Sequence, residues 1–358
     1  TYQDLLTNPH DEALFAYFMD SQLMRITLDG SSTAVGKPAM IKSMLLSPDK
    51  NYLLVESIQK PFSYLVPADR FPYTVEVWSS QGAALKTLAQ LPLDEVRPTG
   101  FDATVSGIRN VNWRADAPAT LYWAEAQDKG DPKIKVSERD IVFTLMAPFT
   151  GEKQKLVGTA LRFGGISWSD DTFALLSERW SASRTEKVSV FQPGAPSQAP
   201  RTIIERSSDD LYNDPGSPVL IDNAYGRKVL QRNGNLVFMT SEGGSPEGSM
   251  PFLSTFNTST KEQKILWRSQ APFYERVTKV LDKEGSQLIT LKESTDMSPN
   301  YWLVNTKKRV APKQLTAFAD PYPTLKGIKK QLITYPRKDG LNLSAVLYTP
   351  EGYDPARD

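Results

Sequence analysis

The sequence contains no cysteine and a single histidine, His10, among its 358 residues. Without cysteine the chain forms no disulfide, no thiolate metal site and no cysteine nucleophile. One imidazole is too few for a zinc or haem site that needs two, and it leaves one candidate base for a serine hydrolase. We therefore expect no metal and no cofactor, and a catalytic triad within the chain would have to use His10.

The chain also lacks a surplus of charge and a long apolar run. It has 42 Lys and Arg against 41 Asp and Glu, whereas a nucleic-acid binder carries a clustered basic excess. No run approaches the roughly 20 apolar residues of a membrane span. We expect neither nucleic acid nor a membrane as a partner. The compartment stays open, with a periplasmic or secreted location the expectation for a bacterial source. Because the sequence opens on Thr1 without a signal-peptide pattern, we expect it to begin inside a longer protein.

A helical pattern is confined to one short segment near the N-terminus. Asp11 and Glu12 precede an apolar group from Ala13 to Phe18, which is typical of a helix with acidic residues in its first turn. Beyond Gln22 the pattern of apolar and polar residues is typical of short strands. The sequence as a whole contains 26 Pro and 21 Gly, which interrupt it at short intervals. The sequence therefore predicts an all-β chain with a helical segment in residues 1–20.

Two kinds of strand pair alternate along the all-β part. The first kind is an apolar strand, a polar turn and a second apolar strand, and its copies are anchored at Leu46, Trp113, Trp168, Leu220 and Leu281. The second kind is a hairpin with a Gly or polar turn, found at residues 75–88, 188–204, 253–266 and 302–315, with an isolated copy at 23–35. Two pairs in each period of roughly 50–65 residues make four strands, which is the blade of a β-propeller.

Five complete periods follow half a period, which predicts about five and a half blades in residues 21–325. A β-sandwich is the alternative, but its strands lack a two-hairpin period. A propeller closes its ring to hide its edge strands, so we expect further blades upstream. After Asp320 the repeat ends. Alternating stretches at 329–335 and 341–348 flank the turn Arg337–Gly340 and predict one more hairpin, outside the propeller. A C-terminal tail that closes the propeller is the alternative.

That last hairpin carries a family resemblance. Tyr335–Leu341, followed by Leu347–Pro355, resembles the start of the α/β-hydrolase domain of prolyl-oligopeptidase-type serine peptidases, and within them it is most similar to glutamyl endopeptidases. Further similar stretches follow in order along the chain: Gln3–Leu6, Arg70–Pro72, Asn112–Asp116, Gly164–Trp168, Asp214–Pro218 and Pro251–Leu253.

The resemblance implies a seven-bladed propeller that filters substrates above a hydrolase domain, whose serine sits in a G-x-S-x-G elbow and is followed by Asp and His. Residues 326–358 would then be a linker and the first hairpin of a truncated hydrolase domain. The implied partners are peptide substrates and that hydrolase domain. The chain has no G-x-S-x-G, since Gly243–Glu247 lacks the last glycine. We therefore expect a serine peptidase as the parent protein and no activity from the chain alone.

Several other polar or aromatic groups have a simpler structural interpretation. Asp209–Gly216 is rich in oxygen ligands but lacks calcium-loop spacing, so a turn is favoured. Glycosidases use paired carboxylates, but the candidates here stand at turn positions: Asp116, Asp170 and Asp171. Lys326–Lys330 is interpreted as a solvated linker, and His10 as a capping or exposed residue. Four tryptophans at strand repeats are expected to pack between blades: Trp78, Trp113, Trp123 and Trp168.

Cleavage after glutamate requires a cation in the pocket for the substrate side chain before the cut bond (P1), and an arginine fork binds a carboxylate bidentately. Five arginines bracket two predicted hairpins, and we expect one or more to bind substrate in a central cavity: Arg109, Arg114, Arg162, Arg179 and Arg184. Ordinary surface arginines are the alternative. The predicted function is the gating and substrate-docking part of a serine endopeptidase that cleaves after Glu. The alternative is a free-standing propeller that binds protein or peptide without catalysis.

Overall fold

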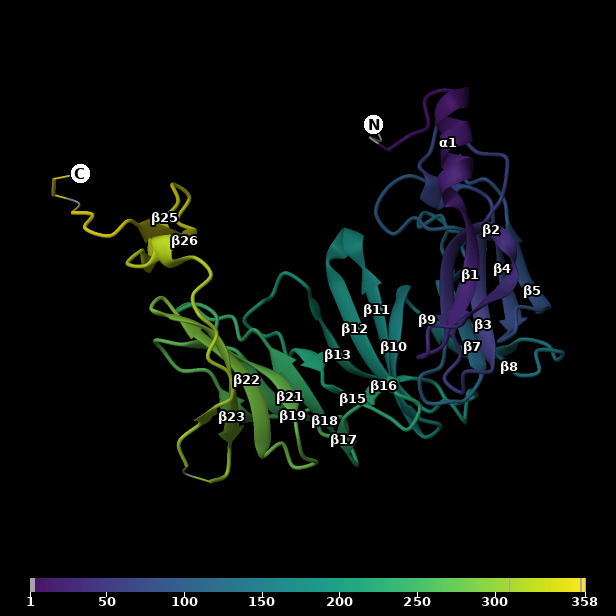
Figure 1. The fold of residues 1–358 in the computed structure, drawn as a ribbon. Helices are drawn as coiled ribbons and strands as arrows, with labels where there is room; N and C mark the ends of the chain where they lie inside the picture. The colour runs from purple at the N-terminus through teal and green to yellow at the C-terminus, as the bar shows by residue number, and fades with distance from the viewer. Residues whose placement is uncertain (1–3, 309, 355, 358) are drawn as a thin grey trace. The chain divides into compact units, whose positions relative to one another are not determined.

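The computed structural model describes residues 4–308, 310–354, 356 and 357. The chain forms two compact units, Thr1–Ser207 with Ile221–Val229, and Ser208–Leu220 with Leu230–Asp358. Apart from helix α1 (Pro9–Met19) and three short 3-10 turns, the regular elements of the described residues are strands (Figure 1). Residues 1–3, 309, 355 and 358 fall within the predicted segments 1–20, 21–325 and 326–358 but lie outside the described residues. The boundaries of those segments stay predictions.

Helix α1 begins close to the predicted position. Asn8 caps it, because its side-chain oxygen accepts hydrogen bonds from the backbone N–H groups of His10 at 2.9 Å and Asp11 at 3.0 Å. His10 is an exposed residue in the first turn of the helix, so Asn8 is the cap and His10 is not. Phe15 attaches the helix to the first unit through an edge-on contact with Phe62, 5.1 Å between ring centroids.

Besides most of a short two-stranded sheet within residues 220–230, the described part of the first unit contains three larger sheets whose strands are hydrogen-bonded antiparallel in chain order. They are β2 (Ser32–Leu46), β3 (Tyr52–Ile58), β4 (Tyr73–Ser79) and β5 (Ala84–Leu91); β6 (Ile108–Trp113), β7 (Thr120–Ala126), β8 (Asp140–Met146) and β9 (Gln154–Thr159); and β10 (Arg162–Asp170), β11 (Phe173–Trp180), β12 (Thr185–Phe191) and β13 (Arg201–Ser207). The predicted half period is β1 (Asp20–Ile26), which pairs with the first part of β2. Four antiparallel strands per period confirm the blade, although the β8–β9 hairpin was not singled out from the sequence.

Among the described residues, the second unit contains two further blades, one of them with an additional short strand, and one hairpin. The fourth blade is built from β14 (Ser217–Pro218), β18 (Leu236–Ser241), β19 (Phe252–Asn257) and β20 (Gln263–Arg268), with β17 (Arg232–Asn233) also on β18. The fifth consists of β21 (Tyr274–Val280), β22 (Gln287–Ser294), β23 (Met297–Asn305) and β24 (Lys313–Gln314). The C-terminal hairpin forms as predicted from β25 (Lys329–Pro336) and β26 (Asn342–Thr349). Its place in a hydrolase domain stays a prediction.

The fourth period differs from the prediction in its first strand pair. The segment predicted as the inner strands forms a separate two-stranded sheet of β15 (Leu220–Asp222) and β16 (Lys228–Leu230). This short hairpin closes on itself through a turn in which the Asn223 side chain accepts hydrogen bonds from the backbone N–H groups of Tyr225 and Arg227, each at 3.0 Å. The hydrogen bonds of this local turn therefore pair β15 with β16 instead of placing them in the blade. In the blade, β14 and β18 take the positions predicted for that pair.

The predicted repeat anchors are equivalent in some blades and displaced by one residue in others. Trp113 is the last residue of β6 and Trp168 lies two residues before the end of β10, so they belong to the first strands of two different sheets, as predicted, and are 5% and 3% exposed. In the fifth blade the buried residue is Val280, at 4%, whereas the predicted anchor Leu281 is 44% exposed. Leu220 is likewise exposed. Neighbours along a strand point to opposite faces, so an error of one residue exchanges a buried position for an exposed one.

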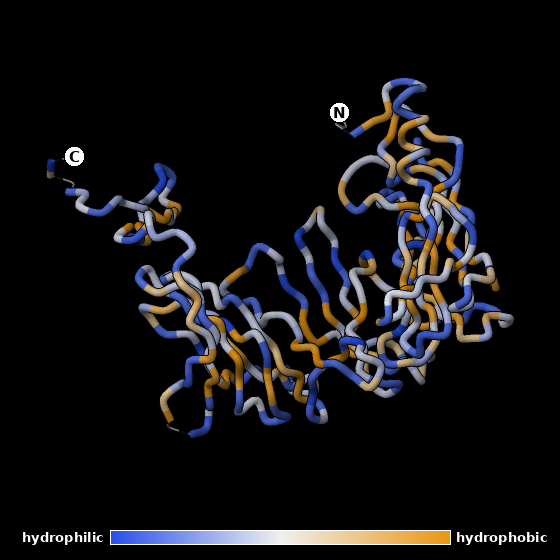
Figure 2. Tube along the Cα trace, viewed as in Figure 1, coloured by the Kyte–Doolittle hydropathy of each residue, from blue (hydrophilic) through white to orange (hydrophobic). Residues whose placement is uncertain are grey.

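Apolar residues along the strands form the core of each unit (Figure 2). In the first unit Val75, Val77 and Leu121 are fully buried in one cluster. The four tryptophans predicted as packing residues are all buried, which confirms that interpretation. This apolar packing fixes the strands of each blade, and with them the positions of the residues at the strand ends.

Candidate functional site

The five arginines singled out from the sequence lie at opposite ends of the strands of the first unit. Arg109 is the second residue of β6, and Arg114 follows the last residue of the same strand. Because a strand rises about 3.3 Å per residue, these two positions are on the order of 15 Å apart. Arg162 begins β10 and Arg179 lies near the end of β11, directly opposite it in register. Arg114 therefore belongs to a different site from Arg162 and Arg179.

Arg162 is held inside the protein by buried carboxylates. Its Nη1 and Nη2 donate to the two oxygens of Asp128 at 2.9 and 2.8 Å, and its Nε donates to the carbonyl oxygen of Asp102 at 2.7 Å. Nη1 also lies 3.2 Å from Asp140. The side chains of Asp128 and Asp140 are completely buried and that of Arg162 is 6% exposed. The bidentate fork that could read a substrate carboxylate is thus occupied by Asp128.

Two more arginines complete this buried network. Arg109 forms an ion pair with Asp140, and Arg139 forms one with Asp128 at 2.9 Å. The guanidinium of Arg139 also lies 4.7 Å from the ring centre of Trp180. Burial lowers the pKa of Arg109, and Asp140 opposes part of that shift. Three guanidinium groups therefore share two carboxylates, and this network connects the starts of β6, β8 and β10 with the end of β7.

The carboxyl group of Asp128 shows that the ion pairs outweigh the cost of burial. Burial alone raises the pKa of Asp128, but hydrogen bonds from Arg162 and Arg139 more than offset it and leave the pKa below its usual value. Asp128 also accepts a hydrogen bond from the backbone N–H of Gly130 at 3.0 Å. Asp128 is therefore charged at neutral pH, and with its arginine partners it acts as a structural clamp.

Arg179 and Arg184 differ from the clamped arginines because both are exposed. Arg179 forms no hydrogen bond or ion pair with the residues that the structure describes. Arg184 follows a 3-10 turn (Ser181–Ser183) in the left-handed region, with φ of 56°. The Asp102 carboxylate fixes that turn, since it accepts hydrogen bonds from the backbone N–H groups of Ser181 at 2.7 Å and Ala182 at 3.0 Å. Arg179 is thus a cation available to a ligand beside a rigid clamp.

Arg114 lies at the other strand end and lines a cavity of about 800 Å³. Its Nε and Nη2 donate to Asp116 at 3.1 and 2.7 Å, and Nη2 also donates to Asp171 at 2.7 Å. The guanidinium lies 4.7 Å from the ring centre of Trp168. Asp116 and Asp171 therefore hold Arg114 in addition to standing in turns, whereas Asp170 has the predicted turn role and accepts a hydrogen bond from the Thr172 N–H at 2.8 Å.

The serine of the incomplete elbow motif and the single histidine belong to different units. Ser245 belongs to the second unit, and its Oγ donates to the carbonyl oxygen of Gly248 at 2.8 Å within a turn, while His10 belongs to the first unit. In the described part of the chain, no group of three or more Asp, Glu or His side chains has an arrangement suited to a metal ion. Among the same residues, no helix has the length and hydrophobicity to cross a bilayer.

Comparison with known proteins gives two curated relatives over the whole chain, while no protein-family model matches it. A protein of Arabidopsis thaliana named "Probable glutamyl endopeptidase, chloroplastic" is 41% identical over 375 residues, which covers 100% of this chain and 39% of the relative. A protein of Oryza sativa subsp. japonica with the same name is 40% identical over 376 residues, covering 100% of this chain and 40% of the relative. Among solved structures, an acylaminoacyl peptidase in complex with Z-Gly-Gly-Phe-chloromethyl ketone has a TM-score of 0.48 and 16% identity, covering 94% of this chain and 48% of that one.

The chain spans about two fifths of the length of the curated relatives that it matches. The identity extends from one end of the chain to the other, and the sheets are the four-stranded blades expected from the resemblance. Both relatives are named as chloroplastic. The chain is therefore similar along its whole length to two proteins that are each named as a probable glutamyl endopeptidase.

Proposed function

We propose that this chain is the gating and substrate-docking part of a serine endopeptidase that cleaves after glutamate. The observation that carries the proposal is the 41% identity to a protein named as a glutamyl endopeptidase, which extends over the whole of this chain. The four-stranded blades support a docking role, because they hold exposed side chains on a rigid frame. Peptide substrates and a hydrolase domain are the partners that this function requires.

Arg179 is the side chain that best fits recognition of an acidic P1 residue. It is exposed, whereas Arg109 and Arg162 are paired with buried carboxylates and Arg114 lies at the opposite strand end. Its strand, β11, pairs with β10 from Arg162 onward, so the clamp fixes the backbone from which Arg179 extends. A glutamate carboxylate can accept two parallel hydrogen bonds from such a guanidinium, one at each oxygen, whereas a glutamine amide has only one oxygen to accept them. Arg184 is the second exposed arginine on this side.

The chemical step belongs to a part of the protein other than this chain. An unassisted serine hydroxyl is a weak nucleophile and needs an imidazole oriented by a carboxylate. The sequence encodes no G-x-S-x-G elbow, and the amide of the residue after the elbow serine is one of the oxyanion donors, each worth on the order of 10²–10³ in rate. We expect a serine-directed fluorophosphonate to label the longer protein and to leave the 358-residue chain unlabelled.

The test uses the longer protein and compares kcat/KM for two peptides that differ only by Glu or Gln at P1. Arg179→Ala is expected to lower the preference for Glu by roughly 10- to 100-fold, since a hydrogen-bonded charge contributes about 1.5–3 kcal/mol. Arg179→Lys keeps the charge without the fork and should lose part of the preference. Arg25→Ala, which removes another exposed arginine from strand β1, serves as the control.

Two results would contradict the proposal in different ways. An unchanged preference in both Arg179→Ala and Arg184→Ala would show that these arginines do not read the P1 carboxylate. If a longer protein that contains this chain is not labelled by the fluorophosphonate and does not cleave peptides, the free-standing peptide-binding propeller becomes the better description.

A further inference from the structure

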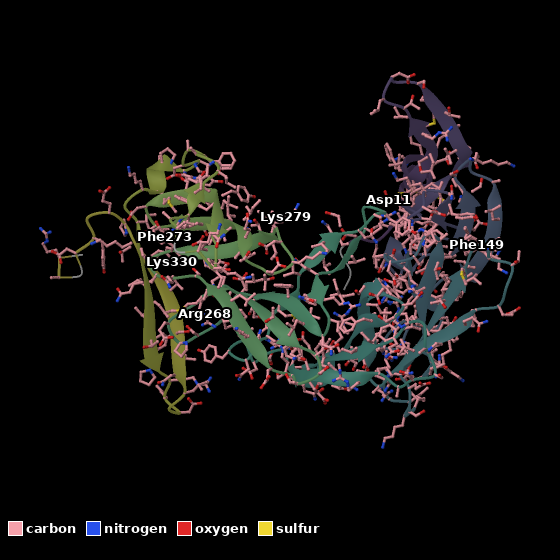
Figure 3. All side chains as sticks on the ribbon, turned by 90° about the horizontal axis from the view of Figure 1, so that it is seen from below. Asp11, Phe149, Arg268, Phe273, Lys279 and Lys330 are labelled. Carbon is pink, nitrogen blue, oxygen red and sulfur yellow. The ribbon has the colours of Figure 1, made fainter. Side chains whose placement is uncertain are left out.

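The cavity beside Arg114 lies at the strand end opposite to Arg162 and Arg179 and has no role in the function proposed above. Its walls come from four turns of the first unit, those that join β2 to β3, β6 to β7, β8 to β9 and β10 to β11. Tyr52, Pro118 and Met146 supply apolar surface, and the Met146 side chain is 69% exposed. Phe149, labelled in Figure 3, lies in the turn between β8 and β9 and is 1% exposed. Its ring packs edge-on against that of Tyr52, with 5.1 Å between the ring centroids.

Three hydrogen-bond donors on the cavity wall have no partner among the residues that the structure describes. They are Nη1 of Arg114, whose side chain is 10% exposed, and the hydroxyl groups of Thr120 and Thr144. None of the three is among the buried side-chain atoms that lack a partner in the described residues, so each is open to water, which a ligand with matching acceptors can replace. Peptide carbonyl groups are acceptors of the right kind, because they are neutral and repeat along an extended chain.

The charge of the cavity favours a cationic ligand. Its lining holds three carboxylates, from Asp49, Glu152 and Asp171, and one guanidinium, that of Arg114, so the sum is −2. Asp116 and Asp171 already neutralise the guanidinium, which disfavours an additional carboxylate. The Asp171 side chain is 74% exposed and can therefore meet a ligand. A long basic side chain can place its charge here while its methylene groups cover apolar surface.

We propose that this cavity binds an extended peptide segment that carries a lysine or arginine side chain. The donors of Arg114, Thr120 and Thr144 bind its main-chain carbonyl groups, and Glu152 and Asp171 bind its cationic group. The site is held in shape before binding, since the backbone N–H of Asp49 donates to the carbonyl of Pro118 at 2.9 Å and so joins two of the turns. It would act as a second, basic-selective docking site, independent of whether the protein cleaves after glutamate.

The charge test measures fluorescence anisotropy of a fluorescein-labelled peptide, Ala-Ala-Pro-Lys-Phe-Ala-Ala, with the purified 358-residue chain at low ionic strength. The same peptide with norleucine in place of lysine is the ligand control. We expect saturable binding of the lysine peptide, weakened about fivefold by norleucine and by the double variant Glu152→Gln, Asp171→Asn, as for loss of an exposed ion pair. Glu247→Gln removes an exposed carboxylate from the second unit and should leave binding unchanged.

The steric test uses Gly151, which lines the cavity and tolerates a side chain. Its φ is outside the left-handed region, and an added Cβ meets no atom within 4 Å. Gly151→Trp should fill the cavity and weaken binding more than tenfold, whereas Gly151→Ala should leave binding intact, with equal thermal stability in both variants. The proposal is overturned if the lysine peptide does not bind, if Gly151→Trp binds as well as Gly151→Ala, or if Glu247→Gln weakens binding as much as the double variant.

Discussion

Replacement of Arg162 by methionine is a direct test of the buried ion-pair network. The variant keeps an apolar side chain of similar length but removes the fork from Asp128 and Asp140, whose side chains have no exposed surface. Removing one partner of a buried ion pair costs about 3–5 kcal/mol because the other charge stays buried. Arg139 still pairs with Asp128 and Arg109 with Asp140, so we expect a loss near the lower limit, about 3 kcal/mol in the free energy of unfolding.

The pH dependence of this loss has a definite sign. Burial raises the pKa of Asp128, and hydrogen bonds from Arg162 and Arg139 outweigh it, so the folded pKa lies below the ordinary value of 3.8. A depressed carboxyl pKa stabilises the fold above the unfolded pKa, and this stabilisation is lost as the pH falls through the folded pKa. In Arg162→Met the pKa of Asp128 rises, and protonation relieves the buried charge. The difference in the free energy of unfolding between variant and wild type is therefore largest at neutral pH and becomes smaller as the pH falls toward about 4.

Urea denaturation followed by tryptophan fluorescence measures both effects, and Trp180 beside Arg139 lies next to the network. Arg179→Met is the matched control, because Arg179 faces Arg162 in register but is exposed. It should change the free energy of unfolding by no more than about 0.5 kcal/mol. A loss below about 1 kcal/mol for Arg162→Met at neutral pH, or a loss that grows as the pH falls toward 4, would refute the reasoning.

Two further variant pairs test the packing of the blades, and each is measured as a free energy of unfolding. Leu121→Ala should cost about 2–5 kcal/mol because Leu121 is fully buried, whereas Leu85→Ala at 49% exposure should cost well below that; similar values would contradict the assignment of Leu121 to the core. Gly30→Ala should cost about 1–2 kcal/mol for its φ of +86°, since its Cβ meets open space. Gly82→Ala should cost clearly more, because its φ is +90° and its Cβ would lie 1.9 Å from the backbone nitrogen of Gly36; equal losses in the two glycine variants would argue against that close approach.

The long-range ion pairs of the arginines could not be predicted from the sequence. Arg162 meets Asp128, which is 34 residues away, and Arg114 meets Asp171, which is 57 residues away. Nothing in the spacing of these residues links them, because their contact depends on which strand ends the sheets bring together. For the same reason the sequence grouped Arg114 with the other arginines, although the strand β6 separates it from Arg109.

The blade architecture follows from local properties of the chain that a sequence shows directly. Alternation of apolar and polar residues and the turns between strands predicted the sheets, the C-terminal hairpin and the helix, while the lack of cysteine and of a second histidine excluded whole classes of chemistry. Strand register and strand partners are not local properties, as Val280 and Leu281 show. A shift of one residue barely changes how well the sequence fits the repeat, but it moves a side chain from the buried face of the sheet to the exposed one. Only the packed structure decides which of two neighbouring residues is buried, and which of five arginines is clamped and which is available to a ligand.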